Sequence, residues 1–248
     1  MGSSKKNKSV SKDINLPLVT KGSWGFKEAY KAARTNLNFI LPGNGCKIIG
    51  ITSAVPGVGK TVTSVNLAIS FAQIGKKVIL IDCDMRLPSI SANLGIKSVP
   101  GLADVLAGEA GLSVSVQRNK ELGLDVLPAG NIPSDPTWLL QSEQLKRLIA
   151  GCRKVYDYVI VDFPPILTVS DALIVSGELD GYVMIVREGI SNYKGIAESL
   201  AQVDLVGGKV LGFIYNDVRS ENHSRYYKSH YYKSNYYYSK GGSRWQVK

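Results

Sequence analysis

The stretch "TSAVPGVGKTVTSVNLA", residues 52–68, decides the fold of this chain. Residues 54–61 within it, "AVPGVGKT", match a phosphate-binding loop with Ala in place of the first Gly. The glycines of such a loop turn backbone N–H groups toward phosphate oxygens, its Lys reaches the β- and γ-phosphates, and its Thr hydroxyl is placed for Mg²⁺. A plain glycine turn between a strand and a helix would need neither the Lys nor the Thr. The predicted binding residues are Gly57, Val58, Gly59, Lys60, Thr61 and Val62.

Short apolar runs alternate with helical patterns on both sides of this stretch. Strands are predicted at 46–52, 77–82, 123–129, 156–162, 181–187 and 209–216, and helices at 24–40, 60–74, 136–153, 170–178 and 192–205. Near-continuous Val, Ile and Leu indicate strands covered on both faces, as in a parallel sheet. The sequence therefore predicts an α/β fold of the P-loop NTPase-like, doubly wound type. In it, helices flank a mainly parallel sheet, and the ligand site lies beyond the carboxyl ends of the strands.

Three aspartates stand at the ends of two predicted strands. "VILIDCDMR" (78–86) contains Asp82 and Asp84, and "YVIVDFPP" (158–165) contains Asp162. A carboxylate that closes an apolar strand is costly unless a cation or a hydrogen-bond donor meets it. For any one of the three, a helix cap or a loop acid is the alternative interpretation. Together, beside a phosphate-binding loop, they predict a metal–nucleotide site in which Asp162 holds Mg²⁺ directly or through water.

Four segments and the end of the chain carry a specific resemblance. They are "PGVGKT" (56–61), "VILIDCDMRLPS" (78–89), "LPAGNIPSDP" (127–136) and "YDYVIVDFPPI" (156–166) with "VSDA" (169–172), followed by a tyrosine cluster. The combination resembles the bacterial tyrosine kinases of capsule and exopolysaccharide assembly, in particular the separately encoded CpsD-type kinases of Gram-positive bacteria. The resemblance covers about residues 20–216 and the tail. It implies ATP- and Mg²⁺-dependent transfer of the γ-phosphoryl group to tyrosine.

The resemblance also implies roles for particular residues. Lys60 and Thr61 would bind phosphates and metal, and Asp84 and Asp162 would organise Mg²⁺ together with Thr61. Asp82, the first acid of the "DxDxR" segment, would orient the tyrosine hydroxyl and accept its proton. Full prior transfer from a phenol to an ordinary carboxylate would cost roughly 8 kcal/mol, so the proton is expected to move late. Asn216, just after the last predicted strand, is a weaker candidate for contacting the adenine.

The same resemblance points to partners. An E-x-x-R-x-x-R segment before the first strand makes subunit contacts in a ring in this family, and Glu28, Lys31 and Arg34 occupy those positions here. Because Lys31 lacks the planar fork of Arg, an ordinary i,i+3 helix pair with Glu28 is the alternative. A membrane-anchored adaptor of the polysaccharide co-polymerase type and a cognate tyrosine phosphatase are the other expected partners.

The end of the chain is the expected substrate. Seven tyrosines alternate with Lys and Ser after residue 225, without hydrophobic periodicity: Tyr226, Tyr227, Tyr231, Tyr232, Tyr236, Tyr237 and Tyr238. A β-prone or partner-binding aromatic strip is the alternative interpretation. The predicted organisation is a basic segment (1–20), a P-loop kinase domain (21–216) and a flexible, disordered autophosphorylation tail (217–248).

Charge and composition limit the setting. The chain of 248 residues carries a net charge of +10, concentrated at its two ends: residues 1–12 contribute +4 and residues 219–248 contribute +6. The neutral middle argues against a nucleic-acid surface on the folded part. The start "MGSSKKNKSV" has no apolar signal region and no apolar run spans a membrane, so a cytoplasmic chain recruited to the inner face of the membrane is expected.

Two other functions compete with the kinase. Partitioning-type (MinD/ParA-like) ATPases share the loop, but they carry a signature Lys five positions before the loop Lys, where this chain has Val55. A nucleotide-binding scaffold whose tail only docks partners is the third interpretation. Val55 and the tyrosine cluster favour the kinase.

Overall fold

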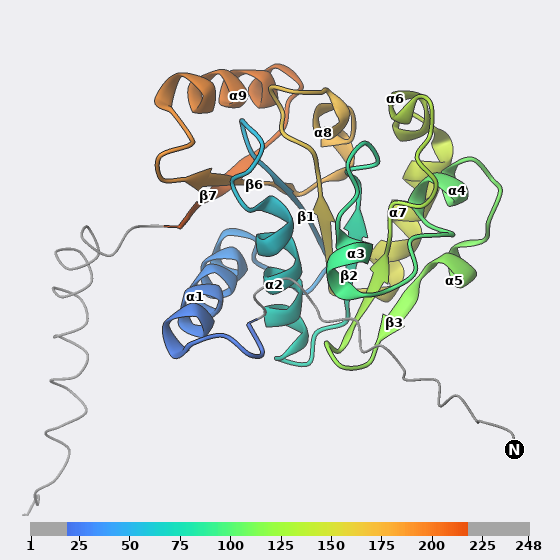
Figure 1. The fold of residues 1–248 in the computed structure, drawn as a ribbon, viewed down its shortest axis with the longest axis horizontal. Coiled ribbons are helices and arrows are strands. Elements are labelled where there is room, and N and C mark those ends of the chain that lie inside the picture. Colours follow the sequence, from blue (N-terminus) through green and yellow to red (C-terminus); the bar gives the residue numbers. More distant parts are fainter. Residues whose placement is uncertain (1–18, 218–248) are drawn as a thin grey trace, which may run out of the picture.

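A computed structural model describes residues 19–217 of the chain (Figure 1). The predicted basic segment up to residue 18 and the seven tail tyrosines lie outside the described residues. In chain order the elements are α1 (Trp24–Ile40), β1 (Lys47–Thr52), α2 (Lys60–Ala72), β2 (Val78–Asp82), α3 (Ile90–Leu94), α4 (Leu102–Leu106), α5 (Leu112–Ser115), β3 (Gln117–Asn119), β4 (Leu124–Leu127), α6 (Pro136–Leu140), α7 (Glu143–Val155), β5 (Tyr158–Asp162), α8 (Asp171–Ile174), the 3₁₀ turn η1 (Ser176–Glu178), β6 (Gly181–Arg187), α9 (Tyr193–Leu205) and β7 (Val210–Asn216).

The strands form one seven-stranded sheet in the order β3-β4-β2-β5-β1-β6-β7. All neighbouring pairs are parallel except β3 with β4. The prediction of a doubly wound, mainly parallel sheet is therefore confirmed. Because β1, β2 and β5 are central and run in the same direction, their carboxyl ends meet at one edge, where Asp82 lies in register with Asp162.

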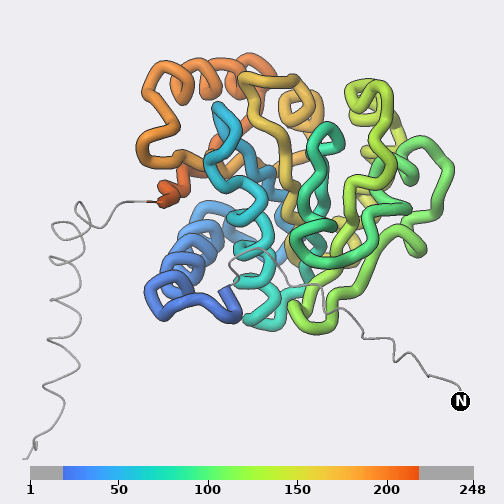
Figure 2. The backbone as a smooth tube through the Cα atoms, viewed as in Figure 1, coloured from blue at the N-terminus to red at the C-terminus, as the bar shows by residue number. Residues whose placement is uncertain are grey.

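Alternating residues of the central strands face two separate apolar cores. Ile48 of β1 belongs to the core covered by α4, α6, α7, α8 and α9, whereas the next residue, Ile49, belongs to the core covered by α1, α2 and α3. Figure 2 shows α1 (blue) running beside α2 (cyan), over the core that contains Ile49. This burial on both faces explains why the strands read as continuous apolar runs rather than as alternating patterns.

The predicted helix 136–153 is wrong as a single element. The chain forms α6 and α7 instead, separated at Gln141 and Ser142. Asp135 caps α6 by accepting the backbone N–H of Thr137, and the hydroxyl of Ser142 accepts the N–H of Leu145 at the start of α7. Each cap satisfies N–H groups that a first helical turn leaves open, so two short helices replace one long one.

The region between β2 and β4 contains structure that no strong pattern predicts. The short helices α3, α4 and α5 and the antiparallel edge strand β3 all lie there. The predicted helix 170–178 likewise divides into α8 and η1. Within residues 19–217, none of the helices is both long and apolar enough to cross a bilayer.

Candidate nucleotide site

The loop between β1 and α2, here called the phosphate cradle, has a backbone geometry that fits phosphate. Gly57 and Gly59 both have positive φ, 76° and 93°, a backbone conformation that side chains disfavour. Gly59 precedes α2 directly, and no side chain caps the first N–H groups of this 13-residue helix. Open N–H groups at the positive end of a helix bind anions, so the loop fits phosphate oxygens.

The end of β7 supports this loop from the side. The side-chain amide of Asn216 donates to the backbone carbonyl of Val58 at 2.9 Å. A Cβ added to Gly59 would collide with the same amide, so the amide would have to shift, and the positive φ of Gly59 disfavours a side chain there as well. The sequence-based prediction for Asn216 was an adenine contact, and the structure puts the residue at the loop itself.

The loop has a second support that the sequence analysis missed. Arg187, the last residue of β6, donates through Nη1 to the carbonyl of Gly57 at 2.8 Å. Its Nε and Nη2 atoms donate to one carboxylate oxygen of Asp217 at 2.9 and 2.6 Å. One guanidinium therefore joins the phosphate cradle to the last described residue of the chain.

Hydroxyl groups cover the carboxylate of Asp162. Thr61 Oγ1 donates to Asp162 Oδ2 at 2.6 Å, and Ser64 Oγ donates to Oδ1 at 2.8 Å. Ser89 Oγ in turn donates to Thr61 Oγ1 at 3.2 Å. Ser64 and Ser89 were absent from the predicted site. Ser64 could have been found, because it lies three residues after Thr61 and hence on the same face of α2.

Asp82 is almost fully buried and accepts two backbone N–H groups. Its Oδ1 accepts from Asp84 at 3.2 Å, and its Oδ2 accepts from Ile90 at 3.1 Å. Burial, aided by the nearby charge of Asp162, raises the pKa of Asp82 to about 8. The carboxylate thus closes the loop 83–90 onto the end of β2.

The three aspartates form an acidic cluster, and burial raises the pKa of each carboxyl group in it. Burial raises the pKa of Asp162 to about 6, against hydrogen bonds from Thr61 and Ser64 that lower it. Burial also raises the pKa of Asp84, although the charge of Lys60 opposes that change. A cation at this edge would relieve the cost of ionising these groups.

The donor set fits Mg²⁺ bound together with a phosphate. Within the described residues, no group of three or more His, Cys, Asp or Glu side chains is arranged to hold a metal ion by itself. Mg²⁺ typically takes only one or two carboxylates from a protein and completes its shell with water and substrate phosphates. Thr61, Asp84 and Asp162 beside the phosphate cradle satisfy that requirement.

An ion pair fixes the loop 83–90 from its outer side. Arg86 Nε and Nη2 donate to Asp171 Oδ2 and Oδ1 at 2.9 and 3.0 Å. Asp171 is fully buried, whereas the side chain of Arg86 is 39% exposed. This two-point contact anchors the segment that carries Asp84 to α8, and the sequence analysis did not single it out as part of the site.

The predicted subunit-contact residues lie apart from this site, on α1. Lys31 Nζ is paired with Glu28 Oε1 at 2.7 Å. Arg34 Nη1 donates to the carbonyl of Ser70, toward the end of α2, at 2.6 Å. These contacts are made within one chain, so the contact between subunits stays a prediction.

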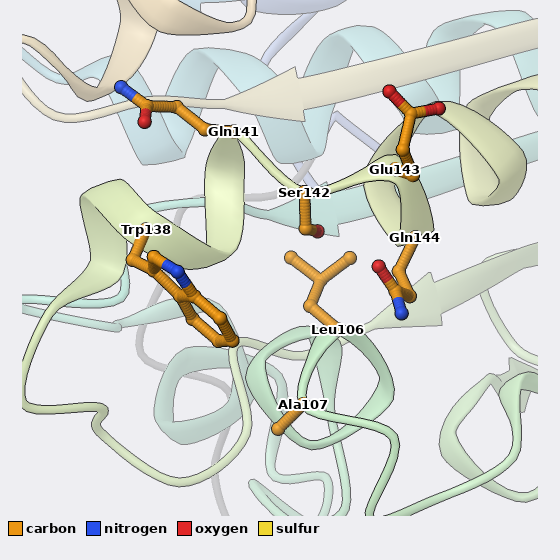
Figure 3. Close-up of a pocket in the computed structure, with 7 residues that line it drawn as sticks. All are labelled: Leu106, Ala107, Trp138, Gln141, Ser142, Glu143 and Gln144. Carbon is orange, nitrogen blue, oxygen red and sulfur yellow. The ribbon is translucent and has the colours of Figure 1, made fainter.

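A separate cavity of about 460 Å³ lies between the end of α4 and the α6–α7 junction. Figure 3 shows the indole of Trp138 along one side of it and the side chains of Glu143 and Gln144 on the other. None of the predicted site residues lines this cavity. The residues that line it are Leu106, Ala107, Trp138, Gln141, Ser142, Glu143 and Gln144.

Comparisons with known proteins add relatives by sequence. A family model described as an AAA domain matches residues 46–210. The tyrosine-protein kinase YwqD of Bacillus subtilis is 37% identical over 222 residues, which cover 90% of this chain and 94% of that protein. The tyrosine-protein kinase CpsD of Streptococcus agalactiae is 36% identical over 201 residues, covering 81% of this chain and 85% of the other.

Solved structures agree with these relatives. The kinase domain of the Escherichia coli tyrosine kinase ETK has a TM-score of 0.75 and 34% identity, covering 77% of this chain and 75% of that one. The cell division protein MinD of Aquifex aeolicus has a TM-score of 0.60 and 25% identity, with 73% of each chain covered. The same fold thus serves both groups, and the tyrosine kinases are the more similar of the two.

Proposed function

Because this chain belongs to the family of bacterial protein-tyrosine kinases, we propose that it transfers the γ-phosphoryl group of ATP to tyrosines of its own C-terminal tail. Its relatives identify the chain as a tyrosine kinase. Its P-loop NTPase-like fold is not the fold of eukaryotic protein kinases. The proposal concerns the donor, the acceptor and the residues that act on them.

The phosphate donor is proposed to bind on the cradle between β1 and α2. Proteins with this loop bind nucleotides together with Mg²⁺. The N–H groups of residues 57–62 would hold the phosphates, Lys60 would reach the β- and γ-phosphates, and Thr61, Asp84 and Asp162 would hold the metal. When bound, Mg²⁺ supplies positive charge that offsets the charge developing on the phosphate oxygens.

Asp82 is proposed to orient the acceptor hydroxyl and to receive its proton late in the transfer. Its position at the end of β2, in register with Asp162, supports a role beside the metal. Its two backbone contacts support a fixed orientation of the carboxylate. In a loose transition state such positioning matters more than early proton removal.

The tail tyrosines are the proposed acceptors: Tyr226, Tyr227, Tyr231, Tyr232, Tyr236, Tyr237 and Tyr238. The chain leaves the sheet at Asn216, which contacts the phosphate cradle through Val58. Tyr226 is ten residues further on and can lie up to about 35 Å away at full extension. That reach supports entry into the same site or into the site of a neighbouring subunit.

Control of polysaccharide synthesis and export is the proposed biological role, as the resemblance implies. A cytoplasmic kinase would be recruited to the inner face of the membrane by an adaptor of the polysaccharide co-polymerase type. It would assemble as a ring through Glu28, Lys31 and Arg34, and a tyrosine phosphatase would reverse its modification. Each phosphate would add about −1.5 to −2 charges to a tail of +6, so a few of them would cancel its positive charge.

The partitioning-type ATPase is not favoured. Val55 stands where those enzymes carry their signature Lys, and the relatives YwqD and CpsD, which this chain matches over most of its length, are tyrosine kinases. The observation that carries the proposal is the Lys60–Thr61–Asp162 arrangement in a chain 37% identical to a tyrosine kinase over nearly its whole length.

The proposal is tested by incubating the full chain with γ-labelled ATP, Mg²⁺ and a fragment of the adaptor's cytoplasmic part, and mapping the label. Phosphotyrosine at residues 226–238 is the expected result. A variant with Phe at all seven positions should keep nucleotide binding and lose the label. Release of free phosphate without labelled tyrosine would overturn the proposal in favour of the ATPase.

A further inference from the structure

We propose that the hydroxyl of Ser89 is a second hydroxyl ligand of the metal ion, next to that of Thr61. Ser89 stands just before α3, at the end of the loop 83–90, and no family motif discussed above assigns it a role. The inference rests on the proposed nucleotide site and adds one ligand to it.

The spacing of the two hydroxyl oxygens carries the inference. Mg²⁺ binds oxygen at about 2.0–2.1 Å in near-ideal octahedral geometry, which places adjacent ligand oxygens about 2.9 Å apart. Ser89 Oγ lies 3.2 Å from Thr61 Oγ1. The observed separation therefore matches two neighbouring positions of one octahedral shell, with an adjustment of a few tenths of an ångström.

The hydrogen-bond directions are compatible with this role. Thr61 donates its own proton to Asp162 and accepts the proton of Ser89. A cation that took the lone pair of Thr61 would displace the Ser89 proton and leave the Ser89 oxygen facing the same ion. Thr61 could keep donating to Asp162 throughout, so only one proton has to turn.

Ser89 is held in place from both sides of the loop. Asn93 Nδ2 donates to the carbonyl of Ser89 at 2.7 Å, and the N–H of the next residue, Ile90, donates to Asp82 Oδ2 at 3.1 Å. Metal binding by Ser89 would therefore fix the loop that also carries Asp84. A preorganised ligand of this kind costs little conformational entropy on binding.

The first test measures metal binding without phosphotransfer. Mn²⁺ is titrated by electron paramagnetic resonance into the full chain with saturating ADP, for wild type, Ser89→Ala and the matched control Ser91→Ala. We expect about a tenfold loss of Mn²⁺ affinity for Ser89→Ala, in the range seen for residues around metal ligands. The metal-free affinity for ADP should stay at the wild-type value, and Ser91→Ala should match wild type in both measurements.

The second test asks whether the contact to the metal is direct. Ser89→Cys replaces a hard oxygen by a soft thiol, which favours Cd²⁺ over Mg²⁺. The thermal midpoint of Ser89→Cys with ADP should rise more with Cd²⁺ than with Mg²⁺, relative to the same comparison in wild type. Because Cys83 is present in both proteins, wild type controls for it.

Three results would count against the inference. Equal Mn²⁺ affinity for wild type and Ser89→Ala would overturn the role of Ser89 as a ligand and leave the proposed nucleotide site in place. A parallel loss of metal-free ADP affinity would show that Ser89 only supports the fold. A wild-type chain that bound no Mn²⁺ in the presence of ADP would overturn the proposed nucleotide site, and this ligand with it.

Discussion

Two loops meet at the carboxyl edge of the sheet, and they are held by different means. The loop 53–59 is supported through its backbone carbonyls, by Asn216 and Arg187 from the β6–β7 side. The loop 83–90 is supported through carboxylates, by Asp82 at the end of β2 and by the Arg86–Asp171 pair toward α8. Carbonyl supports leave the N–H groups of the first loop free for phosphate. The conformation of the second loop, by contrast, depends on the buried carboxylates of Asp82 and Asp171.

The largest effect is expected at Lys60, the first residue of α2, which directly follows the loop 53–59. Lys60→Met removes the cation that would face the transferred group, so tail labelling should fall by about 100- to 1,000-fold. Phosphotyrosine formation at saturating ATP and Mg²⁺ measures this. The unfolding transition should stay close to that of wild type, because Lys60 is not part of the core. Labelling at more than about a tenth of the wild-type rate would contradict the role.

The next largest effect is a loss of stability on removing the ion pair that holds the loop 83–90. Arg86→Ala leaves the buried carboxylate of Asp171 without its partner. We expect a loss of about 2 kcal/mol in the free energy of unfolding, below the 3–5 of fully buried pairs because Arg86 is partly exposed to water. Urea unfolding measures it. Arg118→Ala, which removes an exposed partner of Asp125, is the matched control and should cost far less. Equal losses for both variants would remove the distinction between the loops.

The first loop should respond in nucleotide affinity rather than in stability. Arg187→Ala removes the donor to the carbonyl of Gly57, and we expect the KM for ATP to rise about fivefold with little change in kcat. Arg187→Lys should restore part of the affinity. Asp217→Asn, which leaves the contact to Gly57 in place, should have the smaller effect. If Arg187→Ala instead destabilised the fold as much as Arg86→Ala, the two loops would not differ as described.

The smallest effect sets a baseline outside both loops. Lys31→Ala breaks only the exposed i,i+3 pair with Glu28, so the free energy of unfolding should change by no more than about 0.5 kcal/mol. Analytical ultracentrifugation of the same variant tests its separate predicted role between subunits. A stability loss comparable to that of Arg86→Ala would show that α1 contributes more to the fold than its contacts indicate.

The sequence predicted those parts of the candidate site that carry a local pattern. The motif around Lys60 predicted the phosphate-binding loop, and the apolar runs ending in Asp82 and Asp162 predicted carboxylates beside it. These signals are local, because loop, helix start and strand end follow one another along the chain.

The missing parts depend on contacts between distant segments. Arg187 reaches Gly57 across 130 residues, and Arg86 reaches Asp171 across 85. Such pairs follow from strand order and register, which apolar runs leave open. Ser89 ends the quoted segment 78–89, but serine is common at the starts of helices, so its presence there did not indicate a role in the site. The break between α6 and α7 at Ser142 could have been predicted, because a serine followed by a helical pattern is a recognisable signal for the start of a helix.

The contact of Asn216 with Val58 joins the first strand's loop to the last strand of the domain. On the ribosome, synthesis proceeds from the amino terminus, and residue 216 emerges long after the loop residue that it contacts, Val58. A partly made chain therefore lacks the brace, and the phosphate cradle is completed only when the final strand has joined the sheet. The last strand to be translated thus supports the loop that follows the first strand.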